Sequence, residues 1–263
     1  MPEPMHALAR KALTVSDRDV NRIDLSIVIP AFNEASRIGR ALERASAFLS
    51  ERGLQWEIVV ADDGSTDQTA LIVERFIADA GRGRVKLVRL LPNRGKGAAL
   101  REGVAVTRGD RVLTMDADLA TPIEELDRLM GSLDSGAQVA TGSRAVKSSN
   151  VKRAQAPWRV LLGRAGNLWI RFLAVPGVND TQCGFKLLAG DEGRRLFALT
   201  REDRFGIDIE LLCLARRHLG LRVDEVGVCW EHQDGSKVKW KDYLDVFVRV
   251  PRIAWAVRRL RNR

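Results

Sequence analysis

The feature that most constrains the fold is a repeated pairing of a short apolar run with a longer helical pattern. Four runs rich in β-branched and other apolar residues occur at 25–30, 56–61, 85–91 and 110–115. The first three are each followed by apolar residues at helical spacing, which continue to about Glu51, Ala80 and Val106. Strands that alternate with helices predict right-handed βαβ units. We therefore expect an α/β fold with a mostly parallel sheet flanked by helices.

A polar motif follows each of the four apolar runs. The motifs are Pro30-Ala31-Phe32-Asn33-Glu34, Asp62-Asp63-Gly64-Ser65-Thr66-Asp67, Asn93-Arg94-Gly95-Lys96-Gly97 and Asp116-Ala117-Asp118. In open parallel sheets, ligands bind outside the carboxyl ends of the strands. The sequence therefore predicts one binding site, built from four loops at the same edge of the sheet.

The Asp-x-Asp (DXD) motif at 116–118 indicates a metal site. In an extended chain the side-chain period is two, so Asp116 and Asp118 would point to the same side, roughly 6–7 Å apart. Two carboxylates at the end of a buried strand suit a hard divalent cation that is shared with a diphosphate. Most isolated copies of such a motif are solvated loop residues, so the prediction depends on the neighbouring motifs.

Two of these motifs also have a purely structural interpretation. Ser, Thr and Asp side chains in 62–67 would cap the following helix, but capping does not explain the adjacent, mutually repelling charges of Asp62 and Asp63. Glu34 stands where a helix begins, and its carboxylate would favour the helix dipole whether or not it binds a ligand. Both interpretations of Glu34 stay open.

The motif at 93–97 does not have the spacing of a phosphate-binding P-loop, because Leu90 stands where a glycine is required and Gly97 follows the lysine. One interpretation is a flexible connection between a strand and a helix. In the other, Gly95 and Gly97 let the backbone approach a ligand while Lys96 meets a phosphate.

The net charge of +9 would suggest a nucleic-acid partner if it were spread over the chain. From Lys237 to Arg263, however, nine basic and two acidic residues give a local charge of +7, which leaves +2 for the other 236 residues. The sheet pattern also lacks interleaved basic and aromatic residues, so we expect no nucleic-acid binding. Three scattered cysteines (Cys183, Cys213 and Cys229) argue against disulfides and a zinc site, and for a reducing compartment.

Neither a signal peptide nor a transmembrane helix is expected. The first 23 residues are mixed and polar, and no window of 18 residues is free of charge. Toward the other end, Tyr243, Phe247, Val250, Ala254 and Val257 follow helical spacing, whereas arginines gather on another face. Pro251 is expected to kink or divide this helix. The helix would either pack on the domain with a solvated basic face or lie in a membrane interface with its arginines on anionic headgroups.

Together the four motifs resemble the signature series of family 2 glycosyltransferases with the GT-A fold. Further motifs resemble the dolichyl-phosphate β-glucosyltransferase branch, near the polyprenyl-phosphate mannose synthases: Thr141-Gly142-Ser143-Arg144, Asn179-Asp180-Thr181-Gln182-Cys183-Gly184-Phe185-Lys186, Phe205-Gly206-Ile207-Asp208-Ile209-Glu210 and Gly235-Ser236-Lys237. The resemblance covers about 25–238. It implies a single catalytic domain with a Rossmann-like, mostly parallel sheet. Residues 24–119 would bind a nucleotide sugar and 120–240 the acceptor, between a loose segment at 1–23 and a basic amphipathic helix at 241–263.

The resemblance also implies roles for individual residues. The nucleotide-sugar site would comprise Pro30, Ala31, Phe32, Glu34, Asp62, Asp63, Lys96, Asp116, Ala117, Gln182 and Ser236. Mg²⁺ or Mn²⁺ would be held by Asp116 and Asp118. The acceptor phosphate would be received by Arg144, together with Arg153 or Arg159. Asp118, Asp208, Arg144 and Lys237 would take part in catalysis, with Asp208 on the acceptor side of the sugar.

The implied activity is inverting transfer of a hexose from a nucleotide sugar to polyprenyl or dolichyl phosphate, with glucose and UDP-glucose favoured. A phosphate acceptor needs no general base, because its second pKa near 6 leaves it ionised at about pH 7. It needs positive charge, which Arg144 offers. Alternatives are a GDP-mannose-dependent mannose synthase and a transferase with a soluble acceptor, for which Asp208 would be the base. Asp208 and Glu210 are otherwise favourable charges in a first helical turn. The enzyme is expected to be cytoplasmic and peripheral on the cytoplasmic face of a membrane.

Overall fold

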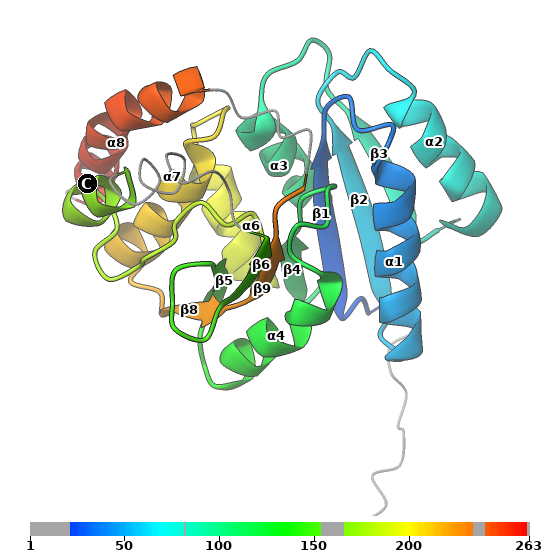
Figure 1. Cartoon of the computed structure of the whole chain (residues 1–263), viewed down its shortest axis with the longest axis horizontal. Coiled ribbons are helices and arrows are strands. Elements are labelled where there is room, and N and C mark those ends of the chain that lie inside the picture. Colours follow the sequence, from blue (N-terminus) through cyan, green and yellow to red (C-terminus); the bar gives the residue numbers. More distant parts are fainter. Residues whose placement is uncertain (1–21, 82, 154–165, 234–239, 262–263) are drawn as a thin grey trace, which may run out of the picture.

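A seven-stranded sheet in the order β3-β2-β1-β4-β7-β5-β8 forms the centre of the computed structural model, which describes residues 22–81, 83–153, 166–233 and 240–261 (Figure 1). Four strands come from the first half of the chain: β1 (Leu25–Ala31), β2 (Trp56–Asp62), β3 (Val85–Arg89) and β4 (Arg111–Thr114). Each pairs in parallel with its neighbours within this group. The predicted βαβ alternation is confirmed.

The connections between these strands are helical, as the spacing of apolar residues predicts. They are α1 (Ile38–Glu51), α2 (Thr69–Phe76) with its π-helical continuation η1 (Ile77–Gly81), and α3 (Lys96–Ala105). The helix α1 buries one apolar stripe, which includes Ile38, Leu42 and Leu49, against the sheet. Such a stripe at a period of 3.6 residues is what fixes a helix to one face of a sheet.

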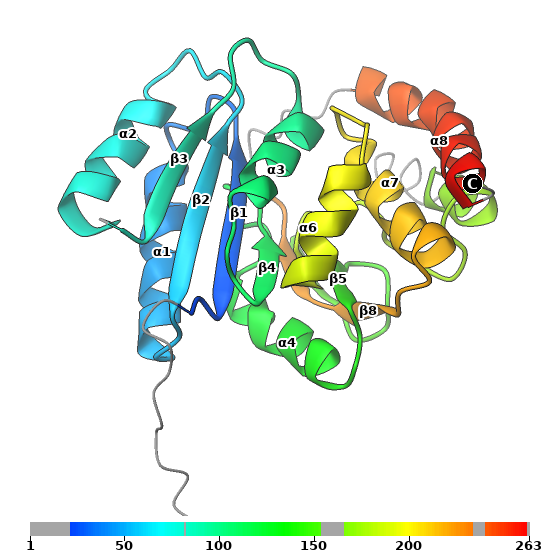
Figure 2. The same cartoon turned by 180° about the vertical axis from the view of Figure 1, so that it is seen from behind.

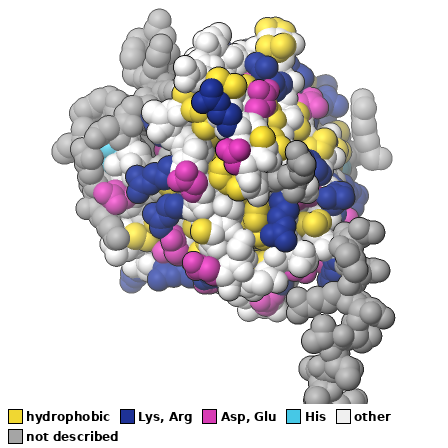
Figure 3. Space-filling view, turned by 90° about the vertical axis from the view of Figure 1, so that its right-hand side faces the viewer, with side chains coloured by type: hydrophobic (Ala, Val, Ile, Leu, Met, Phe, Trp, Pro, Cys, Tyr) yellow, Lys and Arg dark blue, Asp and Glu magenta, His cyan; other side chains and the backbone are white. Residues whose placement is uncertain are grey.

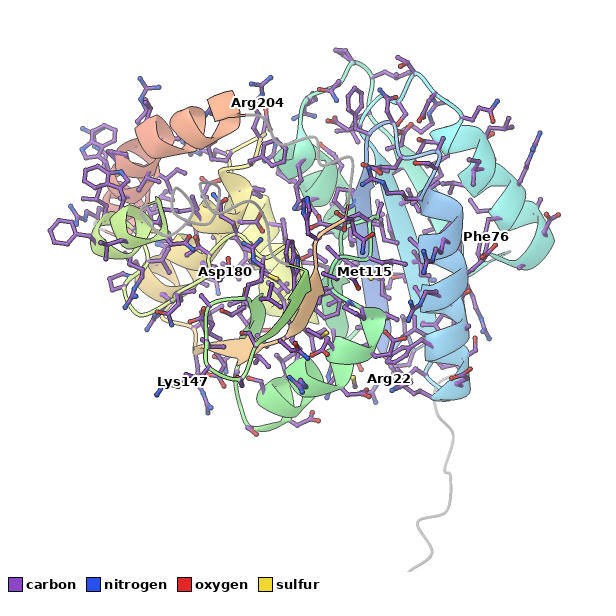
Figure 4. The ribbon with its side chains drawn as sticks, in the orientation of Figure 1. Arg22, Phe76, Met115, Lys147, Asp180 and Arg204 are labelled. Carbon is purple, nitrogen blue, oxygen red and sulfur yellow. The ribbon has the colours of Figure 1, made fainter. Side chains whose placement is uncertain are left out.

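The second half of the chain completes the sheet with mixed pairing. The strand β7 (Lys186–Ala189) lies antiparallel between β4 and β5 (Val139–Ser143), and β8 (Val223–Gly227) pairs in parallel with β5. A 3₁₀ turn η2 (Ile123–Glu125) leads into α4 (Leu126–Asp134). The insertion of β7 next to β4 brings the motif at 179–186 beside the DXD motif. Figure 4 labels Asp180 of the first motif and Met115, which precedes the second, and both lie in the middle of the molecule.

Between β8 and the strand that follows it, the chain passes from one sheet to another. β8 ends at Gly227, and β9 (Cys229–Glu231) pairs instead with β6 (Asn150–Arg153) in a separate two-stranded sheet. A Cβ on Gly227 would lie 2.3 Å from Ser148 Oγ, so the segment that leads into β6 contacts the end of β8 directly. Between the strands, Val228 N donates to Ser143 O at 3.1 Å, and Val228 O accepts from Asn150 N at 3.1 Å.

Two hydrophobic clusters cover opposite faces of the sheet. Ile27 and Ile29 of β1 belong to one cluster, whereas Val28 belongs to the other, as the alternation of side chains along a strand requires. Helices α1 and α4 lie on the face toward the viewer in Figure 1. Helices α3, α6 (Gly190–Leu199) and α7 (Ile207–Cys213), the last continued by η3 (Leu214–His218), cover the face seen in Figure 2.

The C-terminal helix α8 (Trp240–Arg261) packs on α7 and η3. Its apolar residues Val250, Ile253, Ala254 and Val257 are buried in the cluster on that face. Pro251 lies inside this one helix, so the expectation that it divides the helix in two is wrong. None of the helices that the structure describes combines the length and the apolar character needed to cross a membrane.

Candidate functional site

The loops that follow β1, β2 and β3 bind one another at the carboxyl edge of the sheet. Asn33 N donates to Ser65 Oγ at 2.8 Å, and Asn33 Oδ1 accepts from Thr66 N at 2.8 Å. Asp63 joins the second and third loops, because its carboxylate accepts from Arg94 N at 2.8 Å and Gly95 N at 2.7 Å. The predicted meeting of these motifs at one edge is therefore confirmed.

A chain of alternating charges lies where this edge meets the second half of the molecule. Lys96 Nζ is 2.8 Å from Asp116 Oδ1 and 3.8 Å from Asp208 Oδ2. The other oxygen of Asp208, Oδ1, accepts from Lys186 Nζ at 2.6 Å. Lys96 begins α3, Asp116 follows β4, Lys186 begins β7 and Asp208 lies in the first turn of α7. Four elements thus contribute one charge each.

Neighbouring charges at this site shift one another's pKa values. Burial alone would lower the pKa of Lys96, but the carboxylates of Asp116 and Asp208 outweigh it and raise that pKa. Burial would likewise raise the pKa of Asp116, and Lys96 outweighs it, so this pKa is lowered. The pKa of Asp118 is raised, first by burial and then by the neighbouring charge of Asp116. The two aspartates are therefore close enough to repel each other, as ligands of one cation would be.

The DXD motif lies in a turn and not in an extended strand. β4 ends at Thr114, and residues 117–118 form a turn that is followed by Leu119 at a φ of 56°. The side-chain alternation of a strand is therefore not what brings Asp116 and Asp118 together, and that part of the prediction is wrong. The turn holds Asp118 by a hydrogen bond from Ala120 N to Asp118 Oδ1 at 3.0 Å.

Gly184 forms one wall of the Asp116 site. A Cβ on Gly184 would lie 2.1 Å from Asp116 Oδ2, so only glycine leaves room for the carboxylate. Thr114 Oγ1 donates to Gly184 O at 2.9 Å and fixes the two segments against each other. Asp116 is thus held between Lys96 and a glycine backbone, yet 44% of its side-chain surface stays accessible.

Arg144, at the end of β5, is fixed by a bidentate ion pair. Its Nε donates to Asp180 Oδ2 at 2.6 Å and its Nη2 donates to Asp180 Oδ1 at 2.9 Å. Asp180 is buried, and Arg144 outweighs the effect of burial to lower the pKa of Asp180. Glu225 of β8 holds the same segment, because it accepts from Asn179 N and Asp180 N. The guanidinium also lies over the Trp230 ring, 5.4 Å from its centroid.

The adjacent carboxylates at the end of β2 both have partners within the protein. Asp62 Oδ1 accepts from Ser65 N at 3.1 Å, and Asp62 Oδ2 pairs with Arg89 Nε at 3.2 Å. Asp63 organises the 93–95 loop as described above. Both side chains are buried. Their expected role in binding the nucleotide base stays a prediction, but their role in ordering the loops is visible.

Gly95 and Gly97 allow a close approach of another segment of the protein backbone. A Cβ on Gly95 would lie 2.3 Å from Asp203 O, and a Cβ on Gly97 would lie 2.2 Å from Glu202 O. The loop that contains Glu202 and Asp203 is held in turn by Glu210, whose Oε2 accepts from Arg201 N at 2.9 Å and Glu202 N at 2.8 Å. The close approach to a ligand that was the other interpretation of these glycines stays a prediction.

The remaining predicted residues lie around this core. Pro30 and Ala31 end β1, Phe32 follows them and is partly exposed, Ala117 is buried, Glu34 Oε2 lies 3.6 Å from Arg37, and Gln182 N donates to Asp180 Oδ1 at 3.2 Å. Arg153 ends β6, but its side chain lies outside the described part of the structure, as do residues Arg159, Ser236 and Lys237.

Some site residues were not assigned a role from the sequence. Asp180, Gly184 and Lys186 belong to the motif at 179–186, so the signal was present but their individual functions were not. Glu202 and Asp203 carry no motif, and only the fold brings them to Gly95 and Gly97.

The pair Asp116 and Asp118 fits a hard divalent cation by its donor chemistry, because carboxylate oxygens with accessible surface are the ligands that Mg²⁺ and Mn²⁺ prefer. Within the described ranges, no group of three or more His, Cys, Asp or Glu side chains is placed to hold a metal ion. Two carboxylates fill only part of the coordination shell of such a cation, so ligand or water oxygens would complete it.

Comparison with known proteins identifies the family. The model of glycosyl transferase family 2 matches residues 26–187. This chain belongs to that family. Dolichyl-phosphate β-glucosyltransferase of Homo sapiens is 31% identical, over 98% of this chain and 85% of that protein. The protein of the same name from Saccharomyces cerevisiae is 32% identical, over 90% of this chain and 75% of its own length. The expected family resemblance is confirmed.

Solved structures confirm the fold. Glucosyl-3-phosphoglycerate synthase from Mycobacterium tuberculosis, in complex with Mn²⁺, UDP and glucosyl-3-phosphoglycerate, superposes with a TM-score of 0.66 at 24% identity. The match covers 89% of this chain and 80% of that one. The same synthase with Mn²⁺, UDP-glucose and phosphoglyceric acid also gives a TM-score of 0.66. The mostly parallel sheet flanked by helices is thus the expected GT-A architecture.

Proposed function

We propose that this member of glycosyl transferase family 2 is a metal-dependent hexosyltransferase that moves glucose from UDP-glucose to a polyprenyl phosphate such as dolichyl phosphate. One observation carries the proposal: a single short segment holds both groups, because Asp180 accepts from Arg144 Nε at 2.6 Å and Gly184 lies against the Asp116 carboxylate. The DXD carboxylates and a fixed guanidinium therefore share one site. A donor diphosphate on a metal and an acceptor phosphate on an arginine would meet there.

The relatives support this choice of substrates. Proteins named dolichyl-phosphate β-glucosyltransferase from Homo sapiens, Dictyostelium discoideum and Saccharomyces cerevisiae are 31–33% identical to this chain. The M. tuberculosis synthase, which shares the fold, was crystallised with Mn²⁺ and UDP-glucose. UDP-glucose and Mn²⁺ or Mg²⁺ are therefore the first ligands to test.

On the donor side, Asp116 and Asp118 would hold the divalent cation. When bound, the cation supplies positive charge for the departing diphosphate. The chain contributes the position of the carboxylates: Gly184 sets where Asp116 lies, and Ala120 N holds Asp118. Lys96 adds a fixed positive charge 2.8 Å from Asp116. Pro30, Ala31 and Phe32 stand at the end of β1, where the nucleoside would bind.

On the acceptor side, Arg144 would hold the lipid phosphate. Asp180 fixes the guanidinium, and 30% of the Arg144 side-chain surface remains accessible. A phosphate monoester is already ionised at about pH 7, so it attacks the anomeric carbon without a general base. Direct displacement converts the α bond of the donor into a β bond. Arg153, Arg159, Ser236 and Lys237 remain proposed participants.

The surroundings of Asp208 bear on the alternative of a soluble acceptor, which would need a base. Asp208 is buried, Lys186 binds one of its oxygens at 2.6 Å, and Lys96 lies 3.8 Å from the other. Asp208 thus has the position of a counter-charge between two ammonium groups. This arrangement supports a phosphate acceptor over a hydroxyl acceptor.

A nucleic-acid-binding function receives no support from the face shown in Figure 3. Basic and acidic side chains are interspersed there, without a continuous basic patch. Several of the arginines are paired with carboxylates, as Arg44 is with Glu124 and Arg52 with Asp127. Non-specific nucleic-acid binding depends on clustered, unneutralised positive charge.

Turnover of radiolabelled nucleotide sugars tests the proposal. UDP-glucose and GDP-mannose are each incubated with Mn²⁺ and either polyprenyl phosphate, 3-phosphoglycerate or no acceptor. We expect glucose transfer to the lipid alone, and none after chelation of the metal. Transfer from GDP-mannose to the lipid would replace the sugar assignment, and transfer of glucose to 3-phosphoglycerate would replace the acceptor.

We further propose that the protein attaches peripherally to the cytoplasmic face of a membrane, where a polyprenyl phosphate is held. The apolar residues of α8 at 250, 253, 254 and 257 are buried in the domain, so they do not offer the lipid-facing side that the sequence suggested. Other apolar side chains are exposed: Phe172 is 80% accessible, Leu168 67% and Trp255 55%. Arg259 stacks on the Trp255 ring at 3.6 Å.

These exposed residues lie at one end of the molecule. The helical residues 166–173 and the apolar face of α8 share a hydrophobic cluster, and Figure 1 shows both at the left. Leu168 and Phe172 are four residues apart and therefore lie on the same side of their helix. Each arginine near an anionic surface adds on the order of 1 kcal/mol of attraction. This end of the molecule combines apolar and basic groups that suit an anionic lipid surface.

Sedimentation with vesicles tests the attachment. We expect the chain to sediment with phosphatidylserine-containing vesicles, and Phe172→Ser and Trp255→Ser to weaken binding. Leu71→Ser is the matched control, because Leu71 is also an apolar residue with an exposed side chain (42%) but lies on α2. Equal sedimentation of all variants would refute this face as the attachment site. Deletion of 241–263 is unsuitable, because it would uncover the buried cluster.

A further inference from the structure

Lys96 contacts the carboxylate that the proposed metal site needs. Its Nζ lies 2.8 Å from Asp116 Oδ1. The other oxygen of Asp116 faces the Gly184 backbone, where a Cβ would approach to 2.1 Å. The Gly184 backbone therefore blocks one direction in which Asp116 could turn away from Lys96. A divalent cation bound to Asp116 has to share this oxygen with an ammonium group or displace it.

Asp208 offers Lys96 a second carboxylate. Its Oδ2 is 3.8 Å from Lys96 Nζ, which is beyond hydrogen-bond length but would be closed by a movement of about 1 Å. Lys186 keeps Asp208 in place, because its Nζ donates to Asp208 Oδ1 at 2.6 Å and also to the Cys183 carbonyl. Lys186 is fully buried, so this anchor is not free to leave.

We propose that Lys96 is an internal counter-ion that competes with the divalent cation for Asp116, and that Asp208 is the positioning residue that receives Lys96 when the cation binds. The inference rests on the metal site of the proposed function. It gives the buried Asp208 a role that does not require proton transfer. It also accounts for a lysine placed between two carboxylates at unequal distances.

Mn²⁺ binding, measured without nucleotide by the electron paramagnetic resonance signal of free Mn²⁺, tests the competition. Lys96→Met should tighten Mn²⁺ binding by about tenfold, which corresponds to about 1.4 kcal/mol. Lys96→Arg, which retains the charge, should not. Asp208→Asn should weaken binding, because Lys96 then has only Asp116. Lys86→Met is the matched control, since Lys86 also pairs with a carboxylate but not with one of the DXD motif: its Nζ lies 2.8 Å from Oε2 of the buried Glu57.

A double-mutant cycle separates handover of Lys96 from general electrostatics. If Asp208 acts by receiving Lys96, Asp208→Asn has no effect on Mn²⁺ affinity once Lys96 is methionine. If Asp208 acts only through its charge, the weakening persists in both backgrounds, and the inference is overturned. Since Asp208→Asn leaves Lys186 buried without its carboxylate, Lys186→Met/Asp208→Asn serves as a second variant should the single one unfold. Thermal melts report on folding.

The parent and Asp118→Asn distinguish failure of this inference from failure of the proposed function. Mn²⁺ binding that is lost in Asp118→Asn supports the metal site. Unchanged affinity in Lys96→Met would then overturn only the competition. Mn²⁺ binding that does not depend on Asp118 would overturn the metal site and this inference with it.

Discussion

Replacing Gly184 by alanine should abolish most activity without unfolding the protein. An added Cβ would lie 2.1 Å from Asp116 Oδ2 and 2.7 Å from Asp116 Cγ. The atoms it meets belong to the end of a side chain, so the carboxylate can move while the backbone stays. The φ of Gly184 is not among the positive values, so alanine is compatible with the backbone there. The strain falls on the site and not on the fold.

The size of the effect follows from the displacement. Asp116 Oδ2 must withdraw by about 1.3 Å, the difference between 2.1 Å and the 3.4 Å at which ordinary contacts begin. A misplacement of about 1 Å in a catalytic constellation costs about 100-fold in rate, or about 2.7 kcal/mol of transition-state stabilisation. We expect kcat to fall by about that factor, whereas the free energy of unfolding should change by only about 1 kcal/mol.

Turnover of UDP-glucose with polyprenyl phosphate at saturating Mn²⁺ measures the loss, and urea unfolding measures stability. Gly131→Ala in α4 is the control, because a Cβ there meets nothing within 4 Å. It should leave kcat nearly unchanged and raise the free energy of unfolding by at most about 1 kcal/mol, because alanine is favoured over glycine inside a helix. A Gly184→Ala enzyme that is folded and within threefold of the parent in kcat would show that the position of Asp116 does not limit the reaction.

Three further substitutions probe other charges. Asp118→Asn should remove most turnover and leave the melting temperature nearly unchanged, because the side chain is only partly buried and an asparagine oxygen can still accept from Ala120 N; activity within threefold of the parent would refute the metal assignment. Arg144→Ala should raise KM for the lipid phosphate with little change in UDP-glucose affinity, and should also lower stability, because buried Asp180 loses its partner; a collapse of nucleotide affinity would assign Arg144 to the donor. Burial would raise the pKa of Glu57, but hydrogen bonds from Lys86, Ser26 and Arg108 outweigh it and lower that pKa. The ionised Glu57 therefore stabilises the fold above its ordinary pKa of 4.5, and this contribution is lost as pH falls through the lowered value. Unfolding free energies between pH 3 and 7 should therefore decline less steeply in Glu57→Gln, and parallel curves would contradict this.

Much of the first half of the molecule is predictable because its local signals agree with its tertiary structure. The runs at 25–30 and 56–61 are apolar on both faces, as strands buried between two helical layers have to be. The second half is less predictable because its strands change direction and partner. Nothing local in 221–230 shows that the chain leaves β5 after Gly227 to pair with β6.

The site shows the same division between what motifs report and what packing decides. The DXD aspartates were identifiable by residue type, but the turn that brings them together depends on Ala120 and on the end of β4. The sequence indicates that backbone comes close to another group at Gly95 and Gly97, and it does. The partner could not be known, because the carbonyls of 202–203 come from a distant loop that only the α3–α7 packing brings near.

The motif at 179–186 is the part of the sequence that connects these separate elements. Asp180 fixes Arg144 from β5, Gly184 makes room for Asp116 after β4, and Lys186 anchors Asp208 of α7. Each of the three residues touches a different charged group, and none could be exchanged without displacing that group. The motif therefore acts as a scaffold that positions the proposed metal site, Arg144 and the aspartate that lies near Lys96.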